Sequence, residues 1–129
     1  MTRLRWSIVL VGLEPGTVGH EQRGRRRALV VSYESFHSSG MITVCPISAR
    51  EPKYPGEVRI PAGTAGQTLD GVILCHQVRT VDLSRVTSFE IDGRVQHVTD
   101  PAIRAGVRAV LAHHLGLDLP AADDGADAR

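Results

Sequence analysis

Aromatic residues and long apolar runs are both scarce in this sequence. Phe, Trp and Tyr make up 4% of the 129 residues, too few for the broad base-stacking platforms of many single-strand nucleic-acid binders. No apolar stretch is long enough to span a membrane. The N-terminal apolar run stops at Glu14 and Pro15 without a small-residue cleavage site. We therefore expect a first strand rather than a signal peptide, in a cytoplasmic protein.

Cysteine and histidine are too few, and too irregularly spaced, to predict a metal site. The two cysteines, Cys45 and Cys75, each lie in an apolar run and have no Cys-x-x-Cys spacing. We interpret them as small buried side chains in a reducing compartment, with a disulfide as the alternative. The six histidines show no zinc-ligand spacing. The sequence therefore predicts no metal and no other cofactor.

Positive charge is concentrated in the N-terminal half of the chain. Residues 1–60 carry 9 Lys and Arg against 5 Asp and Glu, whereas residues 61–129 carry 6 against 9. A polyanion should therefore meet the N-terminal half. The densest cluster lies in residues 19–31, and its arginines are Arg23, Arg25, Arg26 and Arg27. A cationic loop next to a rigid strand can bind a phosphate. The alternative interpretation is a run of solvent-exposed charges beside a core strand.

Short apolar segments separated by turn residues predict a β-rich fold. The expected strands are residues 8–13, 28–33, 41–47, 57–60, 71–75 with a continuation through 79, 87–91 and 94–98. Asp92 and Gly93, between the last two, form a strong hairpin signal. Short strands need closure or a cover to hide their edges, so we expect a small barrel. Residues 14–27 form a long loop, which in a compact domain is usually functional or disordered.

The hydrophobic period changes near residue 100 and predicts one helix. Its apolar face consists of Ile103, Val107, Val110, Leu111 and Leu115. Thr99 or Asp100 can cap its start and Gly116 its end. We therefore expect a single domain over residues 1–118, mainly β with a C-terminal α-helix. An acidic, disordered tail is expected over residues 119–129.

Four segments resemble the MazF/PemK family of toxins, in the family order and at the family spacing. They are LEPGTVGHEQRGRRRALVVS (13–32), VCPISAR (44–50), YPGEVRIP (54–61) and LDGVILCHQVRTVDLSR (69–85). The resemblance implies a small SH3-like β-barrel of the MazF/PemK/CcdB-like type that forms a homodimer. It also implies a metal-independent toxin endoribonuclease of a type II toxin–antitoxin system, which cuts single-stranded RNA at a short sequence by 2′-OH transesterification. The implied partner is a cognate MazE-like antitoxin.

The resemblance further implies roles for single residues. The family's catalytic arginine falls on Arg26, its catalytic threonine on Ser48, and the acidic residue of its loop motif on Glu21. Gln77 and Arg79 match residues that help line the RNA-binding groove. Arginine is a poor acid at neutral pH, so we expect Arg26 to stabilise charge on the phosphate. The other expected RNA contacts are His20, Gln22, Arg23, Arg25, Arg27, Arg50 and Lys53.

Several of these assignments have an alternative that is purely structural. Ser48 follows a strand and can be a turn former. Glu21 can balance the arginine cluster, and Gln77 can satisfy a backbone group at the barrel edge. His20 flanks the cationic loop and is a candidate general base as well as a contact.

The sequence departs from the family pattern at several positions. Trp6-Ser7 stands in place of the usual Gly-Asp, His76 in place of an aspartate, and Arg27 in place of the strand-opening proline. Ser48 keeps the hydroxyl of the family threonine but loses the restraint of its branched Cβ. These changes leave two alternatives open. One is a relative that binds RNA or an antitoxin with weakened cleavage, and the other is a gyrase-poisoning toxin of the same fold.

Overall fold

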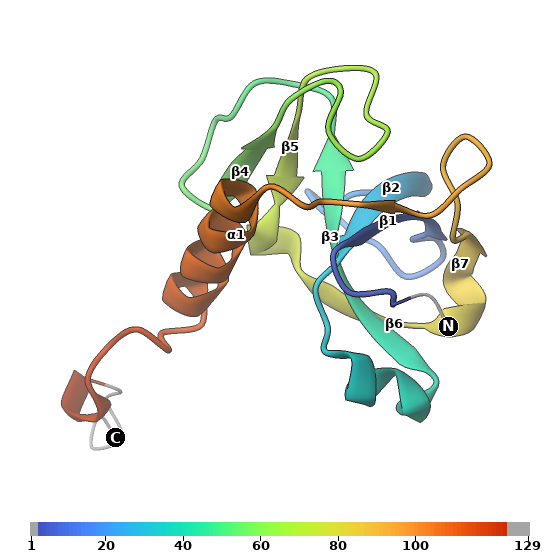
Figure 1. Cartoon of the computed structure of the whole chain (residues 1–129). Helices are drawn as coiled ribbons and strands as arrows, with labels where there is room; N and C mark the ends of the chain where they lie inside the picture. The colour runs from blue at the N-terminus through green and yellow to red at the C-terminus, as the bar shows by residue number, and fades with distance from the viewer. Residues whose placement is uncertain (1–2, 124–129) are drawn as a thin grey trace.

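Eight short strands and one α-helix make up the computed structural model, which describes residues 3–123 (Figure 1). They are β1 Ser7–Gly12, β2 Arg25–Val30, β3 Met41–Ser48, β4 Glu57–Ile60, β5 Gly71–Leu74, β6 Arg79–Asp82, β7 Val86–Ser88, β8 Gln96–His97 and α1 Pro101–His114. The strand order is β4-β5-β3-β2-β1-β7, with β6 paired to β3 and β8 paired to β1. The sheet therefore curls into a half-barrel, and the predicted mainly β fold with a C-terminal helix is confirmed.

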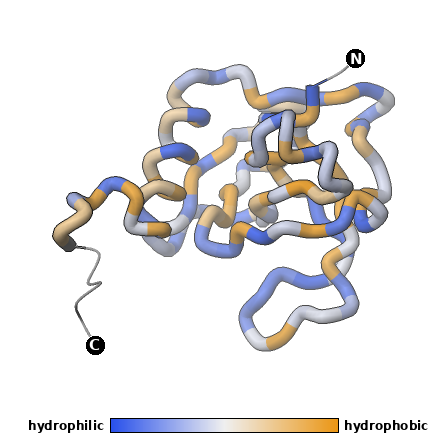
Figure 2. The backbone as a smooth tube through the Cα atoms, turned by 90° about the horizontal axis from the view of Figure 1, so that it is seen from below, coloured by the Kyte–Doolittle hydropathy of each residue, from blue (hydrophilic) through white to orange (hydrophobic). Residues whose placement is uncertain are grey.

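Apolar side chains pack on both faces of the central strands. Leu29 and Cys45 belong to the cluster that α1 covers through Ile103 and Val107, whereas Ala28 belongs to the cluster on the opposite face. Such alternation follows from strand geometry, which sends successive side chains to opposite sides. The hydrophobic stretches accordingly run through the middle of the molecule (Figure 2), and α1 lies beside β4 (Figure 1).

Several strand boundaries differ from the sequence prediction, and two of the differences affect the site. β2 begins at Arg25, three residues before the predicted start, because its ladder with β1 continues as far as Gly12. The strand expected through residues 71–79 is interrupted by a 3₁₀ turn, Cys75–Gln77, after which β6 pairs with β3. Both differences affect the site, because Arg25, Arg26 and Arg27 belong to a strand and Gln77 lies on a turn.

The predicted Asp-Gly turn is present, but the hairpin around it is short. Asp92 and Gly93 have φ values of 53° and 83°, and a bridge between Ile91 and Arg94 closes the turn. The flanking strands do not pair with each other, because β7 and β8 each pair with β1 instead.

The helix begins and ends as the sequence predicts. Asp100 caps α1 by accepting a hydrogen bond from the Ala102 N–H at 2.9 Å, and Gly116 after its end has a φ of 71°. Among the described residues, no helix is both long and apolar enough to cross a bilayer. Residues 121–123 form a 3₁₀ turn. The rest of the expected tail, residues 124–129, lies outside the described residues, so its disorder stays a prediction.

Candidate active site

The loop predicted over residues 14–27 spans residues 13–24, because Arg25, Arg26 and Arg27 belong to β2, and Arg85 anchors its first part. The guanidinium of Arg85 donates hydrogen bonds to the carbonyl oxygens of Gly12, Glu14 and Pro15, at 3.4, 3.3 and 3.2 Å. This anchor was missed by the sequence analysis, because no local pattern links residue 85 to a loop some 70 positions earlier. It holds the loop where β1 ends.

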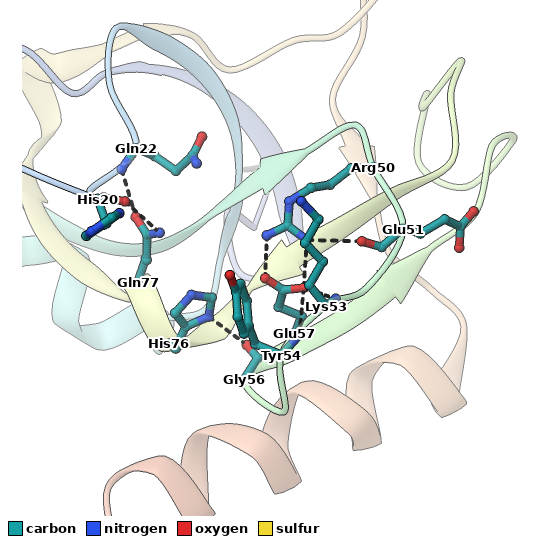
Figure 3. A network of polar contacts seen from close by, with 10 residues as sticks. All are labelled: His20, Gln22, Arg50, Glu51, Lys53, Tyr54, Gly56, Glu57, His76 and Gln77. Atoms are coloured by element: carbon teal, nitrogen blue, oxygen red, sulfur yellow. Dashed lines mark hydrogen bonds and ion pairs between the residues drawn. The ribbon is translucent and has the colours of Figure 1, made fainter.

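Gln77 anchors the far part of the same loop (Figure 3). Its Oε1 accepts from the Gln22 N–H at 2.8 Å, and its Nε2 donates to the His20 carbonyl at 3.3 Å. The Glu21 carboxylate closes the loop tip by accepting from the Val18 N–H at 2.7 Å. Gln77 and Glu21 therefore both position the loop backbone. The RNA contact of Gln77 and the catalytic role of Glu21 stay predictions.

The strand register separates Arg26 from the arginines on either side. Arg26 pairs with Val11, whereas Arg27 pairs with Leu10. Val11 belongs to the cluster away from α1, and Leu10 packs against the cluster that α1 covers. The Cβ of Arg26 therefore points to one face of the sheet, and those of Arg25 and Arg27 point to the other.

Ser48 lies on the same face as Arg26. The β2–β3 ladder pairs Ala28 with Pro46, and the same register continued by two residues places Arg26 opposite Ser48. Directly opposite residues of an antiparallel pair share a face. At this point β3 leaves β2 to pair with β5, where Ser48 is the partner of Val72. The Cβ atoms of Arg26 and Ser48 therefore leave the same face of the sheet at the place where the two strands separate.

The guanidinium groups of the cluster are held by different neighbours. Nε of Arg26 donates to the Arg23 carbonyl at 3.0 Å, and this bond fixes the Arg26 side chain to the loop of residues 13–24. Arg25 donates to Oγ1 of Thr87 at 3.1 Å. These contacts leave the terminal nitrogens of both side chains without a bond to any described residue, so they remain able to bind a phosphate.

Most of the predicted contact residues line one of three cavities. The first, about 410 Å³, is lined by Arg25, Arg26 and Arg27. The second, about 210 Å³, is lined by Glu21, Gln22, Gln77 and Arg79 among others. The third, about 690 Å³, is lined by His20, Gln22, Arg50, Lys53 and Gln77 among others. The structure thus brings the loop, the β3–β4 connection and the 3₁₀ turn together, while Arg23 and Ser48 line none of the three.

Arg50 forms a bidentate ion pair with Glu57 (Figure 3). Both terminal nitrogens of Arg50 donate to this carboxylate, Nη1 to Oε1 at 2.8 Å, and the Lys53 N–H donates to Oε1 at 2.7 Å. The Arg50 guanidinium, aided by backbone N–H groups, lowers the pKa of the Glu57 carboxyl to about 2, although burial opposes this shift. The pair fixes the β3–β4 loop, and it occupies much of the hydrogen-bonding capacity that was predicted for RNA. The sequence analysis did not single out Glu57.

His76 joins the β3–β4 loop to the 3₁₀ turn. Its backbone N–H donates to the Gly56 carbonyl at 3.2 Å, and its ring Nδ1 lies 3.2 Å from the same oxygen. A Cβ on Gly56 would lie 2.6 Å from the His76 Cβ, so this position has no room for a side chain. Residue 56 must therefore be glycine for the β3–β4 loop to pack against residue 76 in this way.

The functional groups that the site provides are fixed cations and a hydroxyl group. Within residues 3–123, no three His, Cys, Asp or Glu side chains are grouped so as to hold a metal ion. Cys45 and Cys75 are free and buried, as predicted. Arg26 and Ser48 supply groups that can stabilise negative charge as it develops on a phosphate.

Comparison with known proteins places these features in a family. Residues 4–113 match the model of the PemK-like, MazF-like toxin of type II toxin-antitoxin system. Endoribonuclease toxin ChpB of Escherichia coli (strain K12) is 36% identical over 102 residues, which cover 77% of this chain and 86% of that protein. MazF of Deinococcus radiodurans is 34% identical, with a TM-score of 0.65 over 87% of this chain and 94% of that one. MazE-MazF from the same organism is matched at 26% identity and a TM-score of 0.64, over 87% and 93% of the two chains. The chain therefore belongs to the family of PemK-like, MazF-like toxins of type II toxin–antitoxin systems.

Proposed function

We propose that the chain is a toxin endoribonuclease that cleaves single-stranded RNA at a short specific sequence without a metal ion. The observation that carries this proposal is the register of β2 and β3, from which strand alternation puts Arg26 and Ser48 on one face where the two strands separate, beside the anchored loop. The similarity to endoribonuclease toxin ChpB supports the same activity.

The reaction is transesterification by the RNA's own 2′-OH. The 2′ oxygen attacks the adjacent phosphorus, the bond from phosphorus to the 5′ oxygen breaks, and the products carry a 2′,3′-cyclic phosphate and a 5′-OH. Arg26 stabilises the charge on the non-bridging oxygens, and the Ser48 hydroxyl holds the same phosphate in register. Glu21 and His20 on the loop are the candidates to accept the proton of the 2′-OH, and water supplies the proton that the departing 5′ oxygen takes up to become the 5′-OH.

The flanking nucleotides are bound by the cavities around this centre. Arg25, Arg27 and Lys53 supply cations for the phosphates on either side. His20 and Gln22, at the 690 Å³ cavity, present polar groups that can read the edges of unstacked bases. Base recognition thus depends on the loop that Gln77 and Arg85 hold.

We further propose that the active form is a cytoplasmic homodimer neutralised by a cognate MazE-like antitoxin. The similarity to MazE-MazF of Deinococcus radiodurans supports such a partner. A disordered acidic segment of the antitoxin would fold into the cationic groove and compete with RNA there.

The test is to incubate the purified protein with mixed-sequence RNA in EDTA and to map the new 5′ ends. We expect discrete cuts that share a short sequence, with 5′-OH termini, and no cuts by an Arg26→Ala protein prepared in parallel. Activity that is lost in EDTA and restored by Mg²⁺ would contradict the mechanism. RNA binding without cuts would point to a relative with weakened cleavage, and the absence of both to a protein target such as gyrase.

A further inference from the structure

A second group of arginines lies near the start of β1, whereas the loop of residues 13–24 follows the end of β1. This group comprises Arg3, Arg5, Arg104 and Arg108, which together with Trp6 and Tyr33 line a cavity of about 480 Å³. We name these six residues the Trp6 cradle. Trp6 directly precedes β1, whereas the loop follows it. Arg27, which pairs with Leu10, is the arginine of β2 nearest to the cradle. Leu10 follows Trp6 by four residues, so the two groups of arginines are about 13 Å apart along β1, at about 3.3 Å per residue.

Trp6 combines an unfavourable backbone conformation with a buried, stacked ring. Its φ is 69°, a left-handed value that bulky residues rarely adopt, at the position where the family pattern has glycine. The side chain is nevertheless only 5% exposed. The guanidinium carbons of Arg5, Arg104 and Arg108 lie 5.1, 5.3 and 5.6 Å from the centre of its ring. Such strain persists only where the surroundings over-determine it, often at binding sites, and here it fixes three cations around one ring.

The arginines of the cradle keep most of their hydrogen-bonding edges free. Stacking uses the flat face of a guanidinium and leaves its in-plane N–H groups available. Nε of Arg5 donates to the Val31 carbonyl at 3.2 Å and Nε of Arg104 to the Val98 carbonyl at 2.6 Å. Among the described residues, no carboxylate forms an ion pair with any of the four arginines. Glu34, the acidic residue that lines the cavity, accepts from the Arg5 backbone N–H at 2.7 Å.

We propose that the Trp6 cradle is a second RNA-binding site, which takes phosphodiester groups of single-stranded RNA outside the sequence that is cut. This inference rests on the proposed endoribonuclease function. Four arginines against the single carboxylate of Glu34 leave the cavity with a net positive charge, which attracts a polyanion, and guanidinium forks match phosphate oxygens. Tyr33, which is 68% exposed and lies 5.1 Å from the Arg5 guanidinium, offers a base a surface for stacking. A long RNA thus contacts both ends of β1.

The residues that line the cavity favour RNA over an acidic peptide or a second copy of the chain. None of them is aliphatic, so a peptide would find partners for its carboxylates but no place for the apolar anchors that peptide recognition uses. A two-fold contact centred on the cradle would bring the same arginines of two copies together, which is repulsive. A nucleotide supplies a phosphate for the arginines and a base for the tyrosine.

The test uses the fluorescence of Trp6, which is the sole tryptophan of the chain. A 2′-O-methyl RNA of mixed sequence, which lacks the nucleophile and is not cut, is titrated into the full chain. We expect a saturable change in Trp6 emission. The double change Arg104→Gln and Arg108→Gln should weaken this binding about tenfold and reduce the slope of log K against log salt by about 1.4, at about 0.7 per phosphate contact.

Two controls separate the cradle from general effects of charge and folding. Arg94→Gln removes one charge from the exposed turn after β7 and should leave the titration unchanged. Arg104→Lys with Arg108→Lys keeps both charges and should keep the salt slope. An RNA that leaves Trp6 emission unchanged would overturn the inference, and so would a polyglutamate peptide that binds as tightly as the RNA.

Cleavage of a long RNA distinguishes failure of this inference from failure of the proposed function. The glutamine double variant should raise KM with kcat unchanged, because it loses binding that is equal in the ground and transition states. Arg26→Ala should lower kcat instead. An unchanged KM in the double variant, with kcat still lost in Arg26→Ala, would overturn the second site and leave the endoribonuclease proposal standing.

Discussion

Ser48 is predicted to stand at the position of the family's threonine, and strand alternation puts its side chain on the same face of the sheet as that of Arg26. Serine lacks the methyl group that restrains χ1 in threonine, so its hydroxyl is less firmly directed at a phosphate. Its backbone carbonyl is already used, because it accepts from the Arg50 N–H at 3.1 Å. The alternative, that Ser48 only shapes a turn, is therefore open to a direct test of the side chain.

Removal of this hydroxyl should slow the chemical step. We expect Ser48→Ala to lower the single-turnover cleavage rate by about 10²-fold, the usual effect of losing one positioned donor, and Ser48→Thr to keep it. Ser38→Ala is a matched control, since that hydroxyl bonds locally to the Ser35 carbonyl. A Ser48→Ala protein with the parental rate would show that the hydroxyl only shapes the turn.

Glu57 is the buried charge that shapes the β3–β4 loop, and its loss should cost stability. Glu57→Gln leaves Arg50 without its carboxylate, so we expect the free energy of unfolding in urea to fall by about 2–3 kcal/mol near neutral pH. Glu51→Gln, at an exposed position of the same loop, is the control. Equal stability of the two variants would contradict a structural role for the pair.

The stabilisation by Glu57 should depend on pH in a defined direction. Its pKa is lowered from the ordinary 4.5 to about 2 in the folded chain, so its contribution is complete above pH 4.5 and is lost as the pH falls towards 2. The difference in unfolding free energy between the parent and Glu57→Gln should therefore shrink across this range. A constant difference from pH 6 to pH 2 would mean that the carboxylate is not linked to folding.

Individual residues of the candidate site could be assigned from the sequence only where they lie in a short segment that resembles the family. Arg26 and Ser48 each lie in a short segment that resembles the family, so both could be placed before the structure. Arg50 was identified as a cation, but its partner could not be, because a pair seven residues apart depends on the path of the loop between them. Arg85 was missed for the same reason over a longer separation.

At the scale of elements, the site depends on a loop that other elements hold. Arg85 comes from the 3₁₀ turn before β7 and Gln77 from the turn after β5, and both bind the loop through its backbone. Such contacts fix a position in space without fixing the loop sequence. Because these hydrogen bonds are made to the backbone, the loop can keep its conformation when its side chains differ.

Gln77 should control how often the loop opens. We expect Gln77→Ala to speed hydrogen exchange at the Gln22 amide, because that N–H loses its acceptor, and to raise KM for RNA a few-fold. Gln77→Glu keeps the acceptor and should protect the Gln22 amide nearly as well as the parent does. Unchanged exchange in Gln77→Ala would show that the loop is held by other contacts.

The elements predicted best are those whose signals are local. The helix was placed correctly because its hydrophobic period, its Asp100 cap and the glycine after its end all lie within the segment itself. The Asp92-Gly93 turn was correct for the same reason. The pairing around that turn is limited to the Ile91–Arg94 bridge. The prediction that the flanking strands pair with each other was wrong, because both pair with β1, which lies far away in the sequence.

At the scale of the whole molecule, the proposed homodimer is a further test. Two copies should be seen at micromolar concentration by light scattering, since a composite groove for RNA and an antitoxin needs both. Added salt should leave the dimer intact if apolar surface carries the contact. A monomer under these conditions would count against a site built from two copies.

The proposed mechanism depends on Arg26, and single-turnover cleavage of one RNA by three variants tests this role most directly. Arg26→Ala should lower the rate by about 10²–10³-fold even at saturating RNA, because it removes the charge stabiliser on the face of Ser48. Arg25→Ala and Arg27→Ala, whose side chains leave the opposite face, should weaken binding and recover the parental rate at saturation. If Arg27→Ala abolishes cleavage and Arg26→Ala does not, the assignment of the catalytic face is wrong.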